Sequence, residues 1–168
     1  MKGQIILELA ETPRQIDEIA SLADCIWREH YAGILKEEQI DYMLETFQSA
    51  AAIQRQKEEQ GYTYFLIEYH GKNAGFFGYQ TEGGKLFLSK LYLLKEFRRK
   101  GLASIVLEYL KTICLERKLS AIWLTVNKQN TASICVYEKK GFRTVREQTT
   151  DIGKGFVMDD YIMELPVS

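Results

Sequence analysis

The sequence contains few of the residues that interrupt or cross-link a chain. Two prolines occur, Pro13 and Pro166, so no proline-rich linker divides the chain. The three cysteines, Cys25, Cys114 and Cys135, fall within helical patterns and lack the spacing of a metal site. We therefore expect reduced cysteines in the core of a cytosolic protein, and no metal.

An excess of one charge and long apolar runs are also missing. The formal net charge is −1, which argues against a general nucleic-acid or membrane binder. The apolar run near the N-terminus is too short for a signal peptide, and no segment is long enough to span a membrane. With 168 residues, of which 46% are hydrophobic, the chain fits one soluble, cytoplasmic domain covering residues 1–168.

The first 60 residues predict a strand followed by helices. Ile5–Leu9 has the composition of a strand, and Thr12 with Pro13 and Gln15 forms a capping box that starts a helix. Further helical spacing covers residues 40–47 and a more polar stretch near residues 50–60.

After residue 61 the composition becomes that of strands. Aromatic and β-branched runs separated by short turns predict three antiparallel strands between residues 62 and 94. A helix with apolar positions from Leu102 to Ile113 leads to Ala121–Val126, a nearly continuous apolar run typical of a buried parallel strand. A helix near residues 131–140 and strands near residues 142–147 and 161–165 follow. Together these elements predict an α/β domain with a mixed sheet.

A basic segment lies where the third of these antiparallel strands gives way to a helix. Arg98, Gly101 and Ala103 follow the pattern R-x-x-G-x-A. A helix start has free N–H groups and a positive dipole end, so extra cations there are favourable only when an anion binds. The glycine lets the backbone turn close to a ligand, and the N–H groups from about Arg98 to Ser104 would cradle a pyrophosphate. The alternative is a plain basic loop with a glycine turn.

A second group of polar residues follows the buried strand. Asn130, Ser133 and Tyr137 lie three and four residues apart, so they share one face of a helix. Taken singly, they are an N-cap, a solvated serine and a core aromatic. Taken together, at a fixed distance after the basic segment, they indicate a site.

These two segments resemble the Gcn5-related N-acetyltransferase (GNAT) family. The family has a Q/R-x-x-G-x-G/A loop and, later, an N-x-x-A-x-x-x-Y-x-x-x-G-F segment, matched here by Asn130, Tyr137, Gly141 and Phe142, with Ser133 in place of alanine. The resemblance implies a mixed, mostly antiparallel sheet of about seven strands, flanked by about four helices.

The resemblance also implies acetyl-CoA as acetyl donor and no metal. Tyr137 would act as the general acid for the thiolate leaving group. The residues expected to bind the coenzyme are Leu91, Tyr92, Leu93, Arg98, Arg99, Lys100, Gly101, Leu102, Ala103, Ser104, Asn130, Ser133 and Tyr137.

The general base is not identified by this resemblance. Many members of the family carry a glutamate on the strand before the loop, but this chain has Ser89 and Lys90 in that region. The alternatives that we weigh are an ordered water or one of four carboxylates, Glu29, Glu68, Asp159 and Asp160.

The acceptor is expected to be a primary amine of a small molecule. Members of the family build the acceptor site from the first helices and the last strands, which here carry Trp27, His30 and Tyr31, and Asp159 and Tyr161. Acidic and aromatic side chains suit a cationic amine, although core packing and a solvated hairpin turn would explain the same residues. The alternatives are an acceptor amine on a protein or peptide and a non-catalytic acyl-CoA-binding domain. A homodimer is possible, because apolar residues line the last strand.

Overall fold

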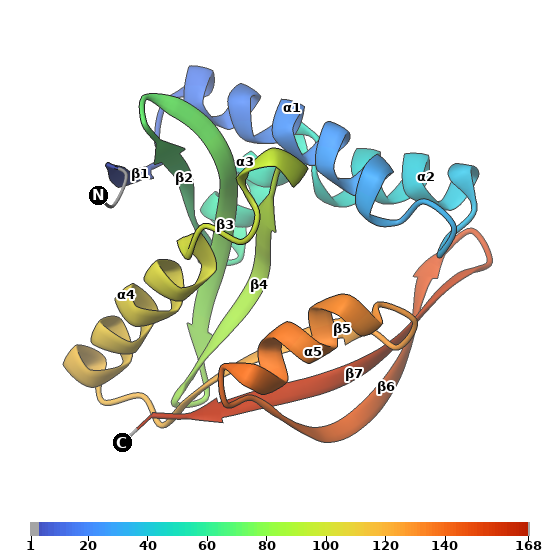
Figure 1. Ribbon diagram of the computed structural model, residues 1–168. Coiled ribbons are helices and arrows are strands. Elements are labelled where there is room, and N and C mark those ends of the chain that lie inside the picture. The colour runs from blue at the N-terminus through green and yellow to red at the C-terminus, as the bar shows by residue number, and fades with distance from the viewer. Residues whose placement is uncertain (1–3, 168) are drawn as a thin grey trace. The chain divides into compact units, whose positions relative to one another are not determined.

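A computed structural model describes residues 4–167 of the chain. In this range seven strands form one sheet with the order β1-β2-β3-β4-β5-β7-β6, and there are five α-helices (Figure 1). The pairs β1–β2, β2–β3, β5–β7 and β6–β7 are antiparallel, whereas β4 and β5 are parallel. The expected α/β class and mixed sheet are therefore confirmed, with one helix more than the expected four.

The chain divides into two compact units, which we describe separately. The first unit comprises the chain up to Gln80 together with Lys90–Val106, and the second comprises Thr81–Ser89 together with the chain from Leu107 onward. Strands β3 and β4 and helix α4 contribute to both units.

The first unit begins with the elements that the sequence predicts. Its capping box is present: the Thr12 hydroxyl accepts a hydrogen bond from the Gln15 backbone N–H at 3.2 Å, and the Gln15 side chain accepts one from the Thr12 N–H at 2.9 Å. Buried apolar residues then recur at helical spacing, which ties the helix to the core. The elements are β1 (Ile5–Leu9), α1 (Pro13–His30), α2 (Glu37–Phe47), α3 (Ala50–Glu59) and β2 (Thr63–Tyr69).

The hairpin of β3 (Lys72–Glu82) and β4 (Lys85–Leu93) contains a close backbone contact. A Cβ added at Gly75 would lie 2.1 Å from the Tyr92 carbonyl oxygen, so β3 must carry glycine at this position. A short 3₁₀ helix, Lys95–Phe97, follows β4 and leads to the basic segment and α4 (Leu102–Arg117).

In the second unit the parallel strand β5 (Ala121–Asn127) pairs with β7, and α5 (Thr131–Lys139) follows β5 directly. The last two strands, β6 (Arg143–Gly153) and β7 (Phe156–Pro166), form one long hairpin, drawn from orange to red in Figure 1. Both strands are longer than predicted. Asp159 and Asp160 lie inside β7, so they do not form a hairpin turn.

The expectation that the cysteines lie in the core is corrected for two of them. Cys114 is buried, but Cys25 and Cys135 are exposed. Cys25 lies off the buried face of α1, and α5, which carries Cys135, has no fully buried residue. None of the helices in the described range combines the length and the apolar character needed to cross a membrane.

Candidate functional site

The basic segment has the backbone of a ligand-binding loop. Arg99 adopts a φ of 63° and Gly101 a φ of 81°, so the chain turns sharply twice just before α4 begins at Leu102. A Cβ at Gly101 would meet nothing within 4 Å, which leaves open space beside the backbone. The first turn of α4 provides N–H groups without intrahelical acceptors, so the segment fits an anionic group such as a pyrophosphate.

The guanidinium of Arg98 is held by protein groups. It donates to the two carboxylate oxygens of Glu29 at 2.9 and 3.1 Å, and its Nε donates to the Leu93 carbonyl at 3.2 Å. The Arg98 hydrogen bond lowers the pKa of Glu29 below its ordinary value, so Glu29 stays ionised. Arg98 therefore ties helix α1 to the end of β4 and is less available than expected as a phosphate ligand.

Aromatic residues gather at the end of helix α1. The Trp27 ring packs edge-on against Tyr31 and Tyr92, with ring centroids 5.7 and 5.6 Å away. His30 packs edge-on against the same two tyrosines. Trp27 and Tyr31 are buried, whereas His30 and Tyr92 are partly exposed. Burial, followed by the charge of Arg98, lowers the pKa of His30, which keeps its imidazole neutral at neutral pH.

Helix α5 carries the second predicted group. The Asn130 side chain accepts a hydrogen bond from the Ser133 N–H at 3.2 Å and so caps the helix. Tyr137 is partly exposed, and its ring packs edge-on against Phe142 at 5.4 Å. The structure confirms Asn130 as the N-cap of α5. Its role in coenzyme binding stays a prediction.

The two aspartates of β7 differ in environment. Asp159 is exposed, lies 2.9 Å from the Lys128 ammonium and accepts a hydrogen bond from Thr149. The Lys128 hydrogen bond lowers the pKa of Asp159. Asp160 is buried, and its Oδ1 has no hydrogen-bond partner among residues 4–167. Burial, together with the nearby charge of Asp159, raises the pKa of Asp160 to about 6.

The remaining carboxylate candidate and Tyr161 lie in strands. Glu68 belongs to β2, where it pairs with Ile6 of β1. Tyr161 is partly exposed on β7, and the Lys128 ammonium lies 5.5 Å from its ring centroid. Within residues 4–167, no three or more His, Cys, Asp or Glu side chains are grouped so that they could hold a metal ion.

Lys90, which in the sequence is seen only as a replacement for the family's glutamate, has an unusual environment in the structure. It is buried on β4, with its ammonium 4.8 Å from the ring centroid of Tyr62 and 5.6 Å from that of Tyr64. Burial lowers its pKa to about 7. The only available signal was its place in the alternation of β4, where it follows Leu86 and Leu88 on the buried side.

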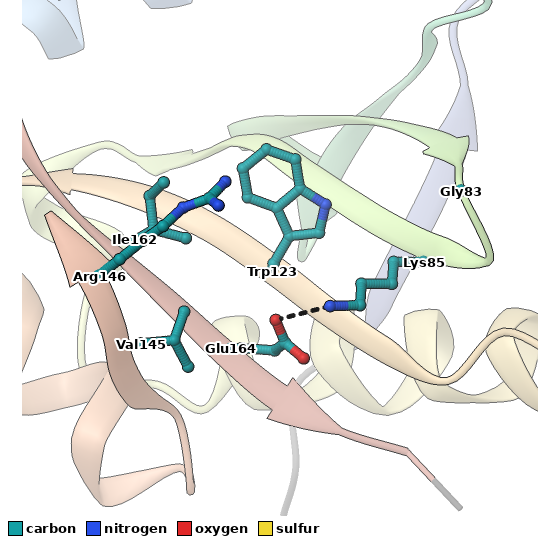
Figure 2. Close-up of a pocket in the computed structure, with 7 residues that line it drawn as sticks. All are labelled: Gly83, Lys85, Trp123, Val145, Arg146, Ile162 and Glu164. Carbon is teal, nitrogen blue, oxygen red and sulfur yellow. Dashed lines mark hydrogen bonds and ion pairs between the residues drawn. The ribbon is translucent and has the colours of Figure 1, made fainter. Parts of the chain in front are cut away.

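The second unit also has a surface hollow of about 500 Å³ (Figure 2). Trp123 forms part of its wall and stacks on Phe87, with ring centroids 4.1 Å apart. The carboxylate in its lining, Glu164, forms an ion pair with Lys85 at 3.1 Å (Figure 2). Because that carboxylate is paired, the hollow is a poor place for proton transfer.

Comparison with known proteins agrees with the resemblance. A model of the Acetyltransferase (GNAT) family matches residues 19–142. The chain is 33% identical over 112 residues to the [ribosomal protein bS18]-alanine N-acetyltransferase of Escherichia coli K12, covering 64% of this chain and 73% of that protein. It is 36% identical over 75 residues to the Salmonella typhimurium protein of the same name, covering 44% and 50%.

Solved structures share the fold. The PaiA N-acetyltransferase from Thermoplasma acidophilum in complex with coenzyme A has a TM-score of 0.78 at 22% identity, covering 99% of both chains. The ribosomal-protein-S18-alanine N-acetyltransferase from Escherichia coli has a TM-score of 0.71 at 21% identity, covering 98% of this chain and 95% of that chain. With the family match over most of its length, this chain belongs to the GNAT family of N-acetyltransferases.

Proposed function

We propose that this enzyme transfers the acetyl group of acetyl-CoA to the N-terminal α-amine of a protein or peptide. The observation that carries the proposal is the 33% identity over 112 residues to enzymes named for acetylating an alanine of ribosomal protein bS18. The sequence alone favours a small-molecule amine, with an amine of a protein or peptide as the alternative. The relatives favour that alternative, and a ribosomal-protein acceptor agrees with the expected cytoplasmic location.

The acidity of the acceptor supports this choice. An α-ammonium has a pKa near 8, whereas an alkylammonium of lysine or a polyamine has a pKa near 10.4. About a tenth of an α-amine is therefore already neutral at pH 7, against less than about a thousandth of an alkylamine. A chain with Ser89 and Lys90 in place of the family's strand glutamate is better suited to the acceptor that needs less help from a base.

The aromatic group at the end of α1 also suits a peptide. The indole N–H of Trp27 is buried and has no hydrogen-bond partner among residues 4–167. A peptide can supply a carbonyl to such a donor, whereas a protonated polyamine offers only donors. In this proposal Trp27, His30 and Tyr92 contact the acceptor, while Tyr31 packs against their rings and holds them in place.

Acetyl-CoA supplies an activated acetyl group, and the residues expected to hold it are those of the basic segment and helix α5. The open backbone at Gly101 leaves room for the pyrophosphate, and the first turn of α4 provides N–H donors. The Leu91–Leu93 backbone would bind the pantetheine arm like an added strand, except that the Leu93 carbonyl already accepts from Arg98. Tyr137 would donate its proton to the thiolate.

The test is release of free thiol from acetyl-CoA with three acceptors. These are a peptide with a free N-terminal alanine, the same peptide with its N-terminus blocked, and spermidine. We expect turnover with the free peptide and none with the blocked one. A preference for spermidine would overturn the proposed acceptor, and acetyl-CoA binding without turnover of any amine would favour the non-catalytic alternative.

A further inference from the structure

The four carboxylates considered as the general base now differ clearly. Glu29 forms an ion pair with Arg98. Asp159 forms an ion pair with Lys128 and accepts a hydrogen bond from the Thr149 hydroxyl. Both are therefore stabilised as anions by a cation, which makes them weak proton acceptors. Glu68 lies in β2 and pairs with β1, outside the first helices and last strands that are expected to build the acceptor site.

Asp160 has the properties that the other three lack. The residue is 7% exposed, and its Oδ1 has no hydrogen-bond partner among residues 4–167. A buried carboxylate oxygen without a donor is costly, because desolvation is not offset by a hydrogen bond. A donor that arrives with a ligand, such as an ammonium group, would remove this cost.

The position of Asp160 in the second unit agrees with a catalytic role. Its cross-strand neighbour is Asn127, the last residue of β5, and the chain then leads through Asn130 to helix α5, which carries Tyr137. The Lys128 N–H donates to the Asp159 carbonyl at 3.1 Å, so β7 and the loop before α5 are joined at this point. Asp160 and Asn130, the N-cap of the helix that carries Tyr137, are thus held at the same end of β5.

We propose that Asp160 is the general base that accepts the proton of the acceptor's α-ammonium group. This inference rests on the acetyl transfer proposed above. Asp160 takes one proton, the freed nitrogen forms a bond to the acetyl carbonyl carbon, and the carbon–sulfur bond breaks. Tyr137 protonates the leaving thiolate and recovers a proton as the new amide nitrogen loses its second one. The proton on Asp160 passes to solvent, so the reaction yields an amide, a thiol and one proton.

The acidity of Asp160 matches this acceptor. A carboxyl group with a pKa of about 6 lies about two units below an α-ammonium, so proton transfer is unfavourable by about 100-fold. For a lysine or polyamine the gap is more than four units, or over about 10,000-fold. The charged groups near Asp160 are Asp159, which raises its pKa, and Lys128, which lowers it and is itself paired with Glu147.

The experiment measures kcat against pH with saturating peptide, for wild-type enzyme and Asp160→Asn. Asparagine keeps the size of the side chain but cannot accept the proton. We expect kcat to fall by about 100-fold or more and the acidic limb of the pH profile near pH 6 to disappear. Acetyl-CoA affinity should stay close to that of wild type, and the melting temperature should not fall, because the variant removes a buried charge. The matched control is Asp151→Asn on the same hairpin, where asparagine can still accept the Gly153 N–H bond.

Several outcomes would overturn the proposal. One is a folded Asp160→Asn enzyme that keeps the wild-type rate and the same acidic limb. If that variant does not fold, Asp159→Asn decides the matter: it removes a charge that raises the pKa of Asp160, so the limb must move to lower pH. If the acidic limb of the kcat–pH profile stays at the same pH in Asp159→Asn, Asp160 is not the general base. Wild-type enzyme that uses only spermidine overturns the acceptor but leaves this test to run with that amine, whereas no turnover with any amine rejects both proposals.

Discussion

Among single residues, Lys90 makes the fold itself sensitive to pH. Its ammonium is buried against two tyrosine rings, and burial lowers its pKa to about 7. In the unfolded chain a lysine keeps its proton up to a pKa near 10.4. Between these values the unfolded state binds more protons than the folded state, so stability rises with pH from about 7 to about 10.

Replacing Lys90 by methionine should remove this dependence. Methionine fills similar space without a charge, so we expect Lys90→Met to be more stable than wild type at pH 6, with an advantage that shrinks as pH rises toward 10. The slope of the difference is at most about 1.4 kcal/mol per pH unit. Melting temperatures measured from pH 6 to 9.5 test this, and a difference that is constant with pH would contradict it.

Gly101 provides a direct test of the coenzyme cradle. Gly101→Asp places a negative side chain in the open space beside the backbone, so we expect acetyl-CoA binding to be lost in a calorimetric titration. Gly101→Ala adds only a methyl group and left-handed strain of about 1–2 kcal/mol. The control Gly84→Ala has a similar φ of 78° in the β3–β4 turn. If Gly101→Asp bound acetyl-CoA as well as Gly84→Ala does, the cradle assignment would be wrong.

Tyr137 should separate chemistry from binding. Tyr137→Phe removes the hydroxyl but keeps the ring that packs on Phe142. A lost general acid typically costs about 100-fold or more in rate, so we expect a lower kcat with nearly unchanged acetyl-CoA affinity. Steady-state kinetics and a binding titration on the same protein measure both values. An unchanged kcat would exclude Tyr137 from proton transfer.

At the scale of elements, helix α5 depends on its cap. Asn130→Ala removes the hydrogen bond to the Ser133 N–H and should cost about 1 kcal/mol, whereas Asn130→Ser keeps a capping oxygen and should cost much less. Chemical denaturation of the two variants measures this difference. Equal losses would mean that the cap contributes little, and a loss of acetyl-CoA binding in Asn130→Ser would show that asparagine has a further role.

The sequence predicted well those elements whose signals are local. The capping box at Thr12 and the apolar spacing of α1 are set by residues four or fewer positions apart, so they can be found without a structure. Strand β6 is mostly exposed and shows no alternation between buried and exposed residues, so its full length was missed. Its partner β7 was missed in part because Asp159 and Asp160 look like turn residues.

The candidate site was predictable only where a motif marks it. The segments around Gly101 and Tyr137 were found from their spacing. The pairing of Glu29 with Arg98 spans 69 positions, and the contrast between Asp159 and Asp160 depends on burial and on Lys128. Such long-range contacts leave no local pattern, so the choice among the candidate bases required coordinates.

The whole molecule belongs to the GNAT family, whose model matches residues 19–142. The exposed Val145 and Val157 on the β6–β7 hairpin are compatible with the expected homodimer, which stays a prediction. We propose that the enzyme selects the α-amine of a polypeptide over more basic amines.

The most direct measurement uses one peptide that carries a free N-terminal alanine and an internal lysine. The peptide is incubated with the enzyme, acetyl-CoA and an equal concentration of spermidine, and tandem mass spectrometry locates the acetyl group. We predict that the acetyl group is found on the alanine nitrogen, because that amine is about 2.5 pKa units less basic than the others. Acetylation of the lysine side chain or of spermidine, with the alanine nitrogen left free, would contradict the proposed selectivity for the α-amine.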